Sequence, residues 1–265
     1  MRMGIYSEPQ NMASASIALV NLHLRFKVVN MQHLSRGESL KALLFDFDGT
    51  LVNSEPLHFQ MWQQVLAEYG VELTDLQYKK YYAGVPTLRN AEDMVWRFAL
   101  PVAHTVLSNR KKALTRKVVA EQGFPLIPGV REILTYFSSY DLQLGIVTGA
   151  ARNNVEATLQ TNSIDHYFSL IISGEDISHN KPAPDCYLLA MEKLGITARE
   201  CVTFEDTESG VRAAVAAGIM CMAVPTAMSA HHDFSTAKGV FASLKEASAW
   251  VDAVFLNGNT GHSLE

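Results

Sequence analysis

From residue 40 onward, short apolar runs alternate with longer segments in which apolar positions recur three and four residues apart. The short runs are typical of buried strands, and the longer spacing is typical of amphipathic helices. Strands are predicted over residues 43–45, 144–147, 170–172, 201–204, 220–224 and 240–242. Helices between the later strands are predicted over residues 151–161, 184–194 and 208–217. Strand and helix in alternation predict an α/β fold, with a parallel sheet covered by helices on both faces.

One interval interrupts this alternation. About a hundred residues separate Asp48 from Thr148, whereas a crossover between parallel strands needs only about a dozen or more. Apolar residues at helical spacing begin the interval and end at Gly70, and further helices are predicted over residues 75–82, 88–99 and 103–121. We therefore expect an all-helical domain, residues 57–127, inserted into a core of residues 40–56 and 128–257. Trp62 and Trp96 are expected in the apolar core of the helical domain.

Residues 1–39 have a different pattern from the rest of the chain. Apolar and polar residues alternate over residues 20–28, which predicts a short amphipathic strand. A secretory signal is the competing interpretation, but its basic segment would be Arg2 alone and its apolar stretch is broken by charged residues. We expect a translated leader or an N-terminal tail here.

The charge balance and the cysteines narrow the classes of partner. The 265 residues carry 22 Lys and Arg against 27 Asp and Glu, and the net charge of −5 disfavours a nucleic-acid-binding surface. Cys186, Cys201 and Cys221 are odd in number and far apart, which predicts neither a disulfide framework nor a zinc site and fits a reducing cytoplasm. No apolar run approaches the ~20 residues of a membrane span. We expect a cytoplasmic protein with no nucleic-acid or membrane partner, and nothing predicts an obligate protein partner.

Two acidic residues follow the first predicted strand. Asp46 and Asp48 are two residues apart, so both side chains can project to one side, beyond the strand end where ligands of open α/β sheets bind. Two close carboxylates repel each other, so a cation or a basic side chain is needed to keep both ionised. Gly49 lets the chain leave the strand sharply, and Thr50 offers a hydroxyl. Because Asp and Gly are also common in ordinary turns, this motif alone leaves a plain turn as an equal alternative.

Polar residues that could bind or react with a ligand also follow the later strands. Residues Thr148–Ala150 place a hydroxyl and backbone amides near a helix N-terminus, which suits a phosphate oxygen, although a routine N-cap looks the same. Lys181 precedes a helix in a segment stiffened by prolines, where a surface lysine is the alternative. Glu205 and Asp206 end a buried strand, and two buried acids are costly unless they bind a metal. Four such signals at successive strand ends are hard to attribute to chance.

Together these motifs resemble the four motifs of the haloacid dehalogenase-like hydrolase superfamily. The matching stretches are Phe45–Leu51, Thr148-Gly149, Lys181-Pro182 and Phe204–Asp206. The inserted helices resemble the cap domain of the group that contains phosphoglycolate phosphatases and β-phosphoglucomutases, and the match covers residues 41–255. The resemblance implies a Rossmann-like parallel sheet core with an inserted all-helical cap.

The resemblance also implies roles for individual residues. Asp46 would be the nucleophile that forms an aspartyl-phosphate, and Asp48 would be the general acid and then the general base. Thr148 and the backbone of Gly149 would hold phosphoryl oxygens, and Lys181 would neutralise both the phosphate and Asp46. The presence of Asp48 argues against the dehalogenases of the superfamily, because their leaving halide needs no proton.

A cofactor and a substrate-binding set follow from the same resemblance. Mg²⁺ would be bound by an all-oxygen set, which suits this hard ion, and that set is Asp46, Asp48, Glu205 and Asp206. The implied substrate-binding residues are Thr50, His58, Gly84, Gly149 and Ala150. The expected activity is Mg²⁺-dependent hydrolysis of a small organic phosphate monoester, of the sugar phosphate or phosphoglycolate type, so the expected partner is a small phosphorylated metabolite.

Three alternatives remain. A β-phosphoglucomutase-like activity is suggested by His58 and Gly84, but the Ser-Arg pair that usually follows this glycine is missing, and we expect Arg89 to be a surface charge. A phosphonoacetaldehyde hydrolase would need a cap lysine for a Schiff base, and we expect Lys79 and Lys80 to coat a helix instead. The alternative from another class is a non-catalytic Mg²⁺-binding phosphoacceptor or a relative that binds a partner.

Overall fold

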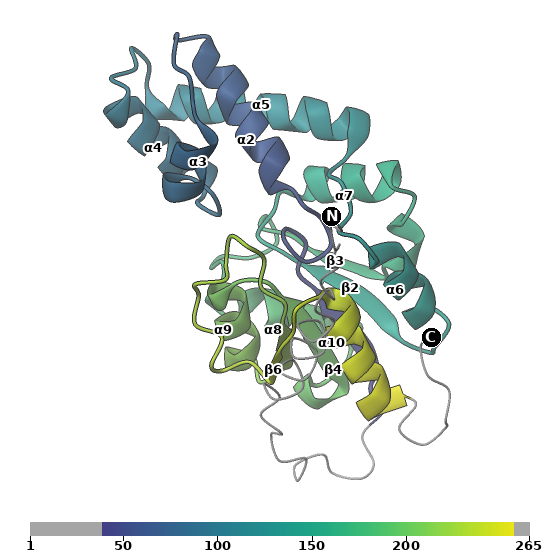
Figure 1. The fold of residues 1–265 in the computed structure, drawn as a ribbon. Coiled ribbons are helices and arrows are strands. Elements are labelled where there is room, and N and C mark those ends of the chain that lie inside the picture. Colours follow the sequence, from purple (N-terminus) through teal and green to yellow (C-terminus); the bar gives the residue numbers. More distant parts are fainter. Residues whose placement is uncertain (1–38, 257–265) are drawn as a thin grey trace, which may run out of the picture. The chain divides into compact units, whose positions relative to one another are not determined.

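A six-stranded parallel sheet organises the protein (Figure 1). The computed structural model describes residues 39–256. The strand predicted over residues 20–28 and residues 1–38 of the expected leader or tail therefore lie outside the described residues. The sheet order is β3-β2-β1-β4-β5-β6. The strands are β1 (Ala42–Phe45), β2 (Gln143–Val147), β3 (Leu170–Ile172), β4 (Cys201–Glu205), β5 (Met220–Ala223) and β6 (Gly239–Val240). The α/β fold predicted from the alternating pattern is confirmed.

The register of the central strands sets the position of the site. All four residues of β1 are buried, as expected for a strand covered on both faces. Phe45 pairs with Ile146 of β2 and with Phe204 of β4. The residues that follow, Asp46, Val147 and Glu205, are therefore brought to one level at the carboxyl end of the sheet. The chain order reverses at β1, and such a switch point is where open α/β sheets bind ligands.

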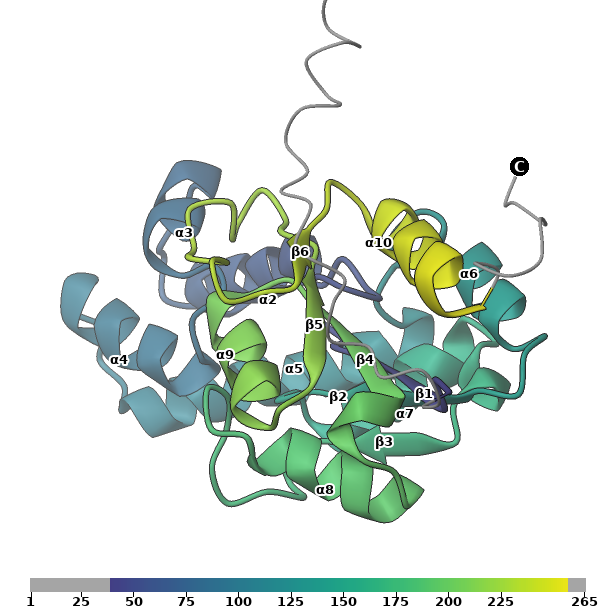
Figure 2. The ribbon, with the colours of Figure 1, turned by 90° about the horizontal axis from the view of Figure 1, so that it is seen from below.

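Helices cover both faces of the sheet (Figure 2). Successive side chains of β1 point to opposite faces of the sheet, so Leu43 and Phe45 face one apolar cluster and Leu44 faces the other. The first cluster is completed by α6 (Val130–Phe137), α7 (Arg152–Thr161) and α10 (Leu244–Val251), and the second by α8 (Asp185–Leu194) and α9 (Glu208–Ala216). Short 3₁₀ turns span Asp165–Tyr167 and Ala198–Glu200, and a π-helical turn spans Asp252–Leu256.

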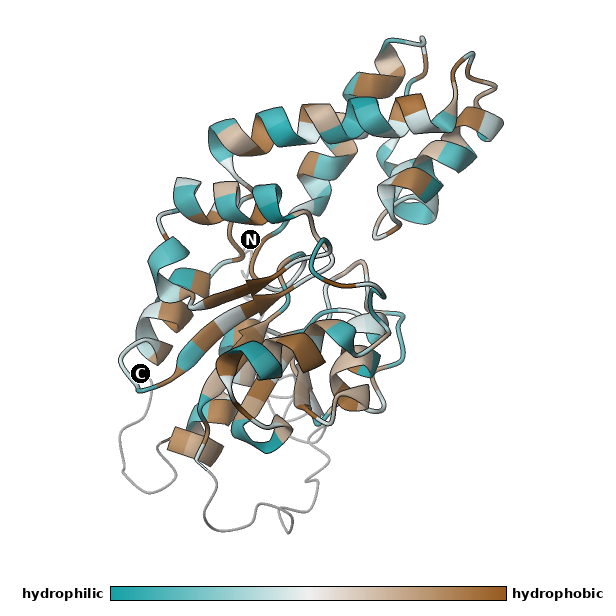
Figure 3. Cartoon of the chain, turned by 180° about the vertical axis from the view of Figure 1, so that it is seen from behind, coloured by the Kyte–Doolittle hydropathy of each residue, from teal (hydrophilic) through white to brown (hydrophobic). Residues whose placement is uncertain are grey.

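The hydropathy of the chain follows this layering (Figure 3). The strands are largely hydrophobic, whereas most helices carry both hydrophobic and hydrophilic residues. Within residues 39–256, no helix is both long enough and apolar enough to cross a membrane.

The residues between β1 and α6 form helices with an apolar cluster of their own. These helices are α2 (Glu55–Ala67), α3 (Asp75–Tyr81), α4 (Thr87–Arg97) and α5 (His104–Gln122). Helix α2 begins at Glu55, two residues before the predicted insertion, with Pro56 in its first turn, where proline is well tolerated. Trp62 is buried in this cluster, as predicted, but the prediction for Trp96 is wrong, because its side chain is 79% exposed. Ala91 and Met94 form the buried face of α4, and Trp96 lies roughly 200° around the helix from Met94.

Candidate active site

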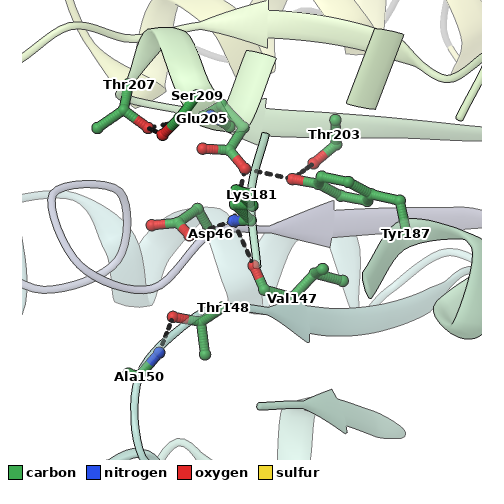
Figure 4. Close-up of polar contacts among 11 residues, drawn as sticks. Asp46, Val147, Thr148, Ala150, Lys181, Tyr187, Thr203, Glu205, Thr207 and Ser209 are labelled. Atoms are coloured by element: carbon green, nitrogen blue, oxygen red, sulfur yellow. Dashed lines mark hydrogen bonds and ion pairs between the residues drawn. The ribbon is translucent and has the colours of Figure 1, made fainter. Parts of the chain in front are cut away.

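Lys181 joins the ends of three neighbouring strands (Figure 4). Its Nζ donates to Asp46 Oδ1 at 2.5 Å and to Glu205 Oε1 at 2.7 Å. It also donates to the backbone carbonyl of Val147 at 2.8 Å. These contacts use all three donors of an ammonium group, and the lysine side chain is only 10% exposed. The loop before α8 therefore supplies a fixed positive charge between β1 and β4.

The charges around Lys181 shift one another's pKa values. Burial would lower the pKa of Lys181, but the negative charges of Asp46 and Glu205 outweigh it and raise that pKa above its ordinary value. Burial raises the pKa of Glu205 to about 7, although Lys181 opposes the shift. Burial and the charge of Asp46 raise the pKa of Asp206 to about 9. One lysine therefore does not offset the negative charge of the three acids, and a further cation would stabilise their ionised forms.

The three acids are suited to bind that cation. Oxygens of Asp46, Glu205 and Asp206 lie within 4.8 Å of one another, and all three residues are buried. Among the described residues, Glu205 Oε2 is buried without a hydrogen-bond partner. Two glycines make room for the carboxylates, because a Cβ on Gly49 would lie 2.1 Å from Asp206 Oδ2, and one on Gly210 would lie 1.8 Å from Glu205 Oε2. Clustered carboxylate oxygens are the donors that a hard divalent cation prefers.

Asp48 occupies the turn directly beyond Asp46. Its Oδ1 is buried and has no hydrogen-bond partner within residues 39–256. Burial is the main cause that raises the pKa of Asp48 to about 6, Asp46 adds to the shift, and Ser54 opposes it. A carboxyl group with a pKa near neutrality can both give and accept a proton, as a general acid and base must.

The two predicted hydroxyl groups are both buried. Thr148 Oγ1 accepts a hydrogen bond from the Ala150 amide at 3.0 Å, which orients the hydroxyl and leaves its own proton to donate. The Ala150 amide is thus already engaged, whereas the next residue after Thr148, Gly149, is exposed. Thr50 is 1% exposed, and its hydroxyl has no partner among the described residues.

His58 and Gly84, the two predicted site residues of the helical segment, contact side chains that were not among the predicted site residues. Lys111 Nζ lies 3.1 Å from His58 Nδ1, and the Gly84 amide donates to Glu55 Oε1 at 3.1 Å. Burial, and next the charge of Lys111, lower the pKa of His58 to about 3, so the imidazole is neutral at physiological pH. Because an ammonium group cannot accept a hydrogen bond, Lys111 must donate to Nδ1, and the proton of His58 is then on Nε2.

A helical pattern could have pointed to Lys111. Leu107, Lys111, Thr115 and Val119 are spaced by four along α5, and all are buried. A lysine on an otherwise buried face is therefore visible in the sequence. By contrast, Arg89 pairs with Glu92 and Lys79 pairs with Asp75 on exposed helix surfaces, which confirms the surface positions predicted for both.

We expect replacement of Lys111 by Met to stabilise the fold at neutral pH. Burial lowers the pKa of Lys111 from 10.5 to about 8, so a folding cost is fully present below pH 8 and fades as the pH rises toward 10.5. Met fills similar space without charge, and the free energy of unfolding should rise by about 1–3 kcal/mol at pH 7. Urea unfolding at pH 7 and 9.5 measures this gain, which should be smaller at the higher pH. Lys117→Met, at an exposed position of the same helix, is the control. An unchanged or lower stability of the Lys111 variant at pH 7 would contradict the prediction.

Comparisons with known proteins agree with this geometry. Residues 43–224 match a family model described as haloacid dehalogenase-like hydrolase. The chain is 32% identical over 182 residues to fructose-1-phosphate phosphatase YqaB of Escherichia coli, covering 69% of this chain and 95% of that protein. It is 30% identical over 185 residues to a phosphorylated carbohydrates phosphatase of Thermotoga maritima, covering 68% of this chain and 82% of that protein. The crystal structure of CbbY from Rhodobacter sphaeroides in complex with phosphate superposes with a TM-score of 0.67 at 25% identity, covering 77% of this chain and 94% of that one.

Proposed function

Since the chain belongs to the haloacid dehalogenase-like hydrolase family, we propose that it is a Mg²⁺-dependent phosphatase acting on a small sugar phosphate through an aspartyl-phosphate. The chain is a phosphoric monoester hydrolase, and the proposal concerns its substrate, its cation and its mechanism. The names of the relatives from Escherichia coli and Thermotoga maritima support a phosphorylated sugar. The observation that carries the mechanism is Asp46, held by Lys181 beside Glu205 and Asp206.

The first step uses both aspartates of the turn after β1. A carboxylate oxygen of Asp46 attacks phosphorus, the bond between phosphorus and the ester oxygen breaks, and the electron pair leaves with the alkoxide. Protonated Asp48 gives its proton to that alkoxide, which departs as the free alcohol. The pKa of about 6 supports this role, because a carboxyl group with an ordinary pKa of 3.8 would hold little proton at neutral pH.

The second step reverses the role of Asp48. Its carboxylate accepts a proton from water, the water oxygen bonds to phosphorus, and the bond from phosphorus to Asp46 breaks. Inorganic phosphate leaves, and Asp46 returns as a carboxylate. Lys181 stays beside Asp46 and offsets the negative charge of its free carboxylate and then that of the phosphoryl group it carries, while the Thr148 hydroxyl and the Gly149 amide hold phosphoryl oxygens.

Mg²⁺ would be held by the side chains of Asp46, Glu205 and Asp206 with the Asp48 carbonyl, and when bound it supplies positive charge to the phosphoryl oxygens. Residues 57–127 serve as the cap in this proposal. Their polar groups, His58 with Lys111 and the loop at Gly84, select the organic part of the substrate. The three free, buried cysteines support a cytoplasmic location.

A panel of phosphate esters tests the proposal directly. Release of inorganic phosphate is measured from fructose 1-phosphate, glucose 1-phosphate, phosphoglycolate and p-nitrophenyl phosphate, with Mg²⁺ and with EDTA. We expect release that requires Mg²⁺ and is fastest with a sugar phosphate. Equal rates in EDTA would contradict the mechanism. Conversion of glucose 1-phosphate into the 6-phosphate without phosphate release would identify a mutase.

A further inference from the structure

A chain of two hydroxyl groups stands behind Glu205 (Figure 4). Thr203 Oγ1 donates to the Tyr187 hydroxyl oxygen at 3.1 Å, and the Tyr187 hydroxyl in turn donates to Glu205 Oε1. Lys181 donates to that same carboxylate oxygen at 2.7 Å. Thr203 is two residues before Glu205 on β4, so their side chains share the face that packs against α8, the helix that carries Tyr187.

Because of these hydrogen bonds, the two oxygens of Glu205 have different surroundings. Oε1 accepts from both Tyr187 and Lys181, whereas Oε2 is buried without a partner within residues 39–256. In Figure 4 the second oxygens of Glu205 and Asp46 both lie on the side away from Tyr187. The first turn of α9 closes in on the carboxylate, because a Cβ on Gly210 would lie 1.8 Å from Oε2. Rotation of the carboxylate plane away from this orientation would break both hydrogen bonds.

Packing alone does not account for the hydroxyl of Tyr187. The ring is fully buried in the apolar cluster between the sheet and α8, and a phenylalanine would bury the same ring there. The hydroxyl, however, needs an acceptor in that dry environment, and it is bonded to one of the three acids that are suited to bind a cation. Lys181 Nζ lies 5.4 Å from the centre of the same ring, so Tyr187 contacts both Glu205 and Lys181.

We propose that Tyr187 is a positioning residue whose hydroxyl fixes Glu205, keeping Oε1 on Lys181 and presenting Oε2 to the divalent cation. This proposal rests on the proposed function for the presence of a divalent cation. It does not depend on the identity of the substrate. Partners behind metal ligands orient those ligands, and their loss typically weakens metal binding by about 10- to 100-fold. Loss of the Tyr187 hydroxyl should therefore show first in Mg²⁺ affinity.

Calorimetric titration of Mg²⁺ into the full chain, without any phosphate ester, tests this role. We expect Tyr187→Phe to weaken Mg²⁺ binding about 10-fold or more. The matched control is Tyr136→Phe, which removes a tyrosine hydroxyl that donates to Asp252 Oδ1 at 2.7 Å, between α6 and the residue after α10. Circular dichroism and thermal unfolding in EDTA show that each variant is folded. The control should bind Mg²⁺ as tightly as the parent chain.

A double-mutant cycle separates positioning from packing. In a Glu205→Gln background, adding Tyr187→Phe should change Mg²⁺ affinity by less than about twofold, because the hydroxyl acts through the carboxylate. An equal factor in both backgrounds, or parent-like affinity of the single Tyr187 variant, would overturn the proposal. Should that variant not fold, Thr203→Val, which removes only the donor to the hydroxyl, is expected to weaken binding about twofold or more, and unchanged affinity overturns the role.

The two proposals fail in different ways. A parent chain that binds Mg²⁺ but releases phosphate from no ester contradicts the proposed function and leaves the role of Tyr187 intact. A parent chain that binds no Mg²⁺ overturns both.

Discussion

Replacement of Asp46 by Asn is expected to lower Mg²⁺-dependent phosphate release by about 10⁴-fold or more while the protein stays folded. An amide of the same shape cannot attack phosphorus, so the covalent route is lost. Its oxygen can still accept the hydrogen bond that Lys181 gives to Asp46 at 2.5 Å. The measurement is steady-state phosphate release from the best ester of the panel, with thermal unfolding in EDTA on the same samples.

The stability of the Asp46→Asn variant is informative in its own right. Burial raises the pKa of Asp46 even though Lys181 opposes the shift, so burial disfavours the ionised carboxylate when no further cation is bound. In EDTA at neutral pH, the variant should unfold at the same temperature as the parent or at a higher one. Asp75→Asn, at an exposed position paired with Lys79, is the control and should leave activity unchanged. Residual activity above about one hundredth of the parent rate would argue against Asp46 as the nucleophile.

The carboxyl ends of the strands could be predicted because local sequence determines them. An apolar run followed by Asp46 or by Glu205 predicts a buried strand that ends in acid, and parallel strands bring such ends together at one edge. The family resemblance implied that Lys181 neutralises Asp46, whereas the order of the strands and the contact between Lys181 and Glu205 came from the structure.

Contacts between distant helices were out of reach of the sequence pattern. Glu55 contacts Gly84 across 29 residues, and Lys111 contacts His58 across 53. Tyr187 reads from the sequence as one more apolar residue of a helix, because nothing local shows that its hydroxyl meets a carboxylate on another strand. The prediction that Trp96 is buried was wrong for a simpler reason. Trp96 does not lie on the buried face of its short helix, so its large apolar side chain remains exposed.

Replacement of Lys181 by Met is expected to remove activity and, unlike Asp46→Asn, to destabilise the fold. The ammonium is shared by Asp46, Glu205 and the Val147 carbonyl, and none of these acceptors is exposed enough to turn to water instead. Loss of one partner of a buried ion pair typically costs about 3–5 kcal/mol. Urea unfolding in EDTA measures the loss, and Lys193→Met, exposed near the end of α8, is the control.

The pH dependence identifies the cause of that loss. Without Lys181, the pKa values of Asp46 and Glu205, which burial already raises, should rise further above their unfolded values. The folded variant then binds more protons than the unfolded chain, so its stability falls as the pH rises through the raised pKa values. The deficit relative to the parent should therefore be larger at pH 8 than at pH 5.5. Equal deficits would mean that lost packing, rather than uncompensated charge, destabilises the variant. The Asp46→Asn and Lys181→Met double variant should lose less stability than Lys181→Met alone. In the double variant only Glu205, and not Asp46 as well, is left as a buried carboxylate without the Lys181 ammonium.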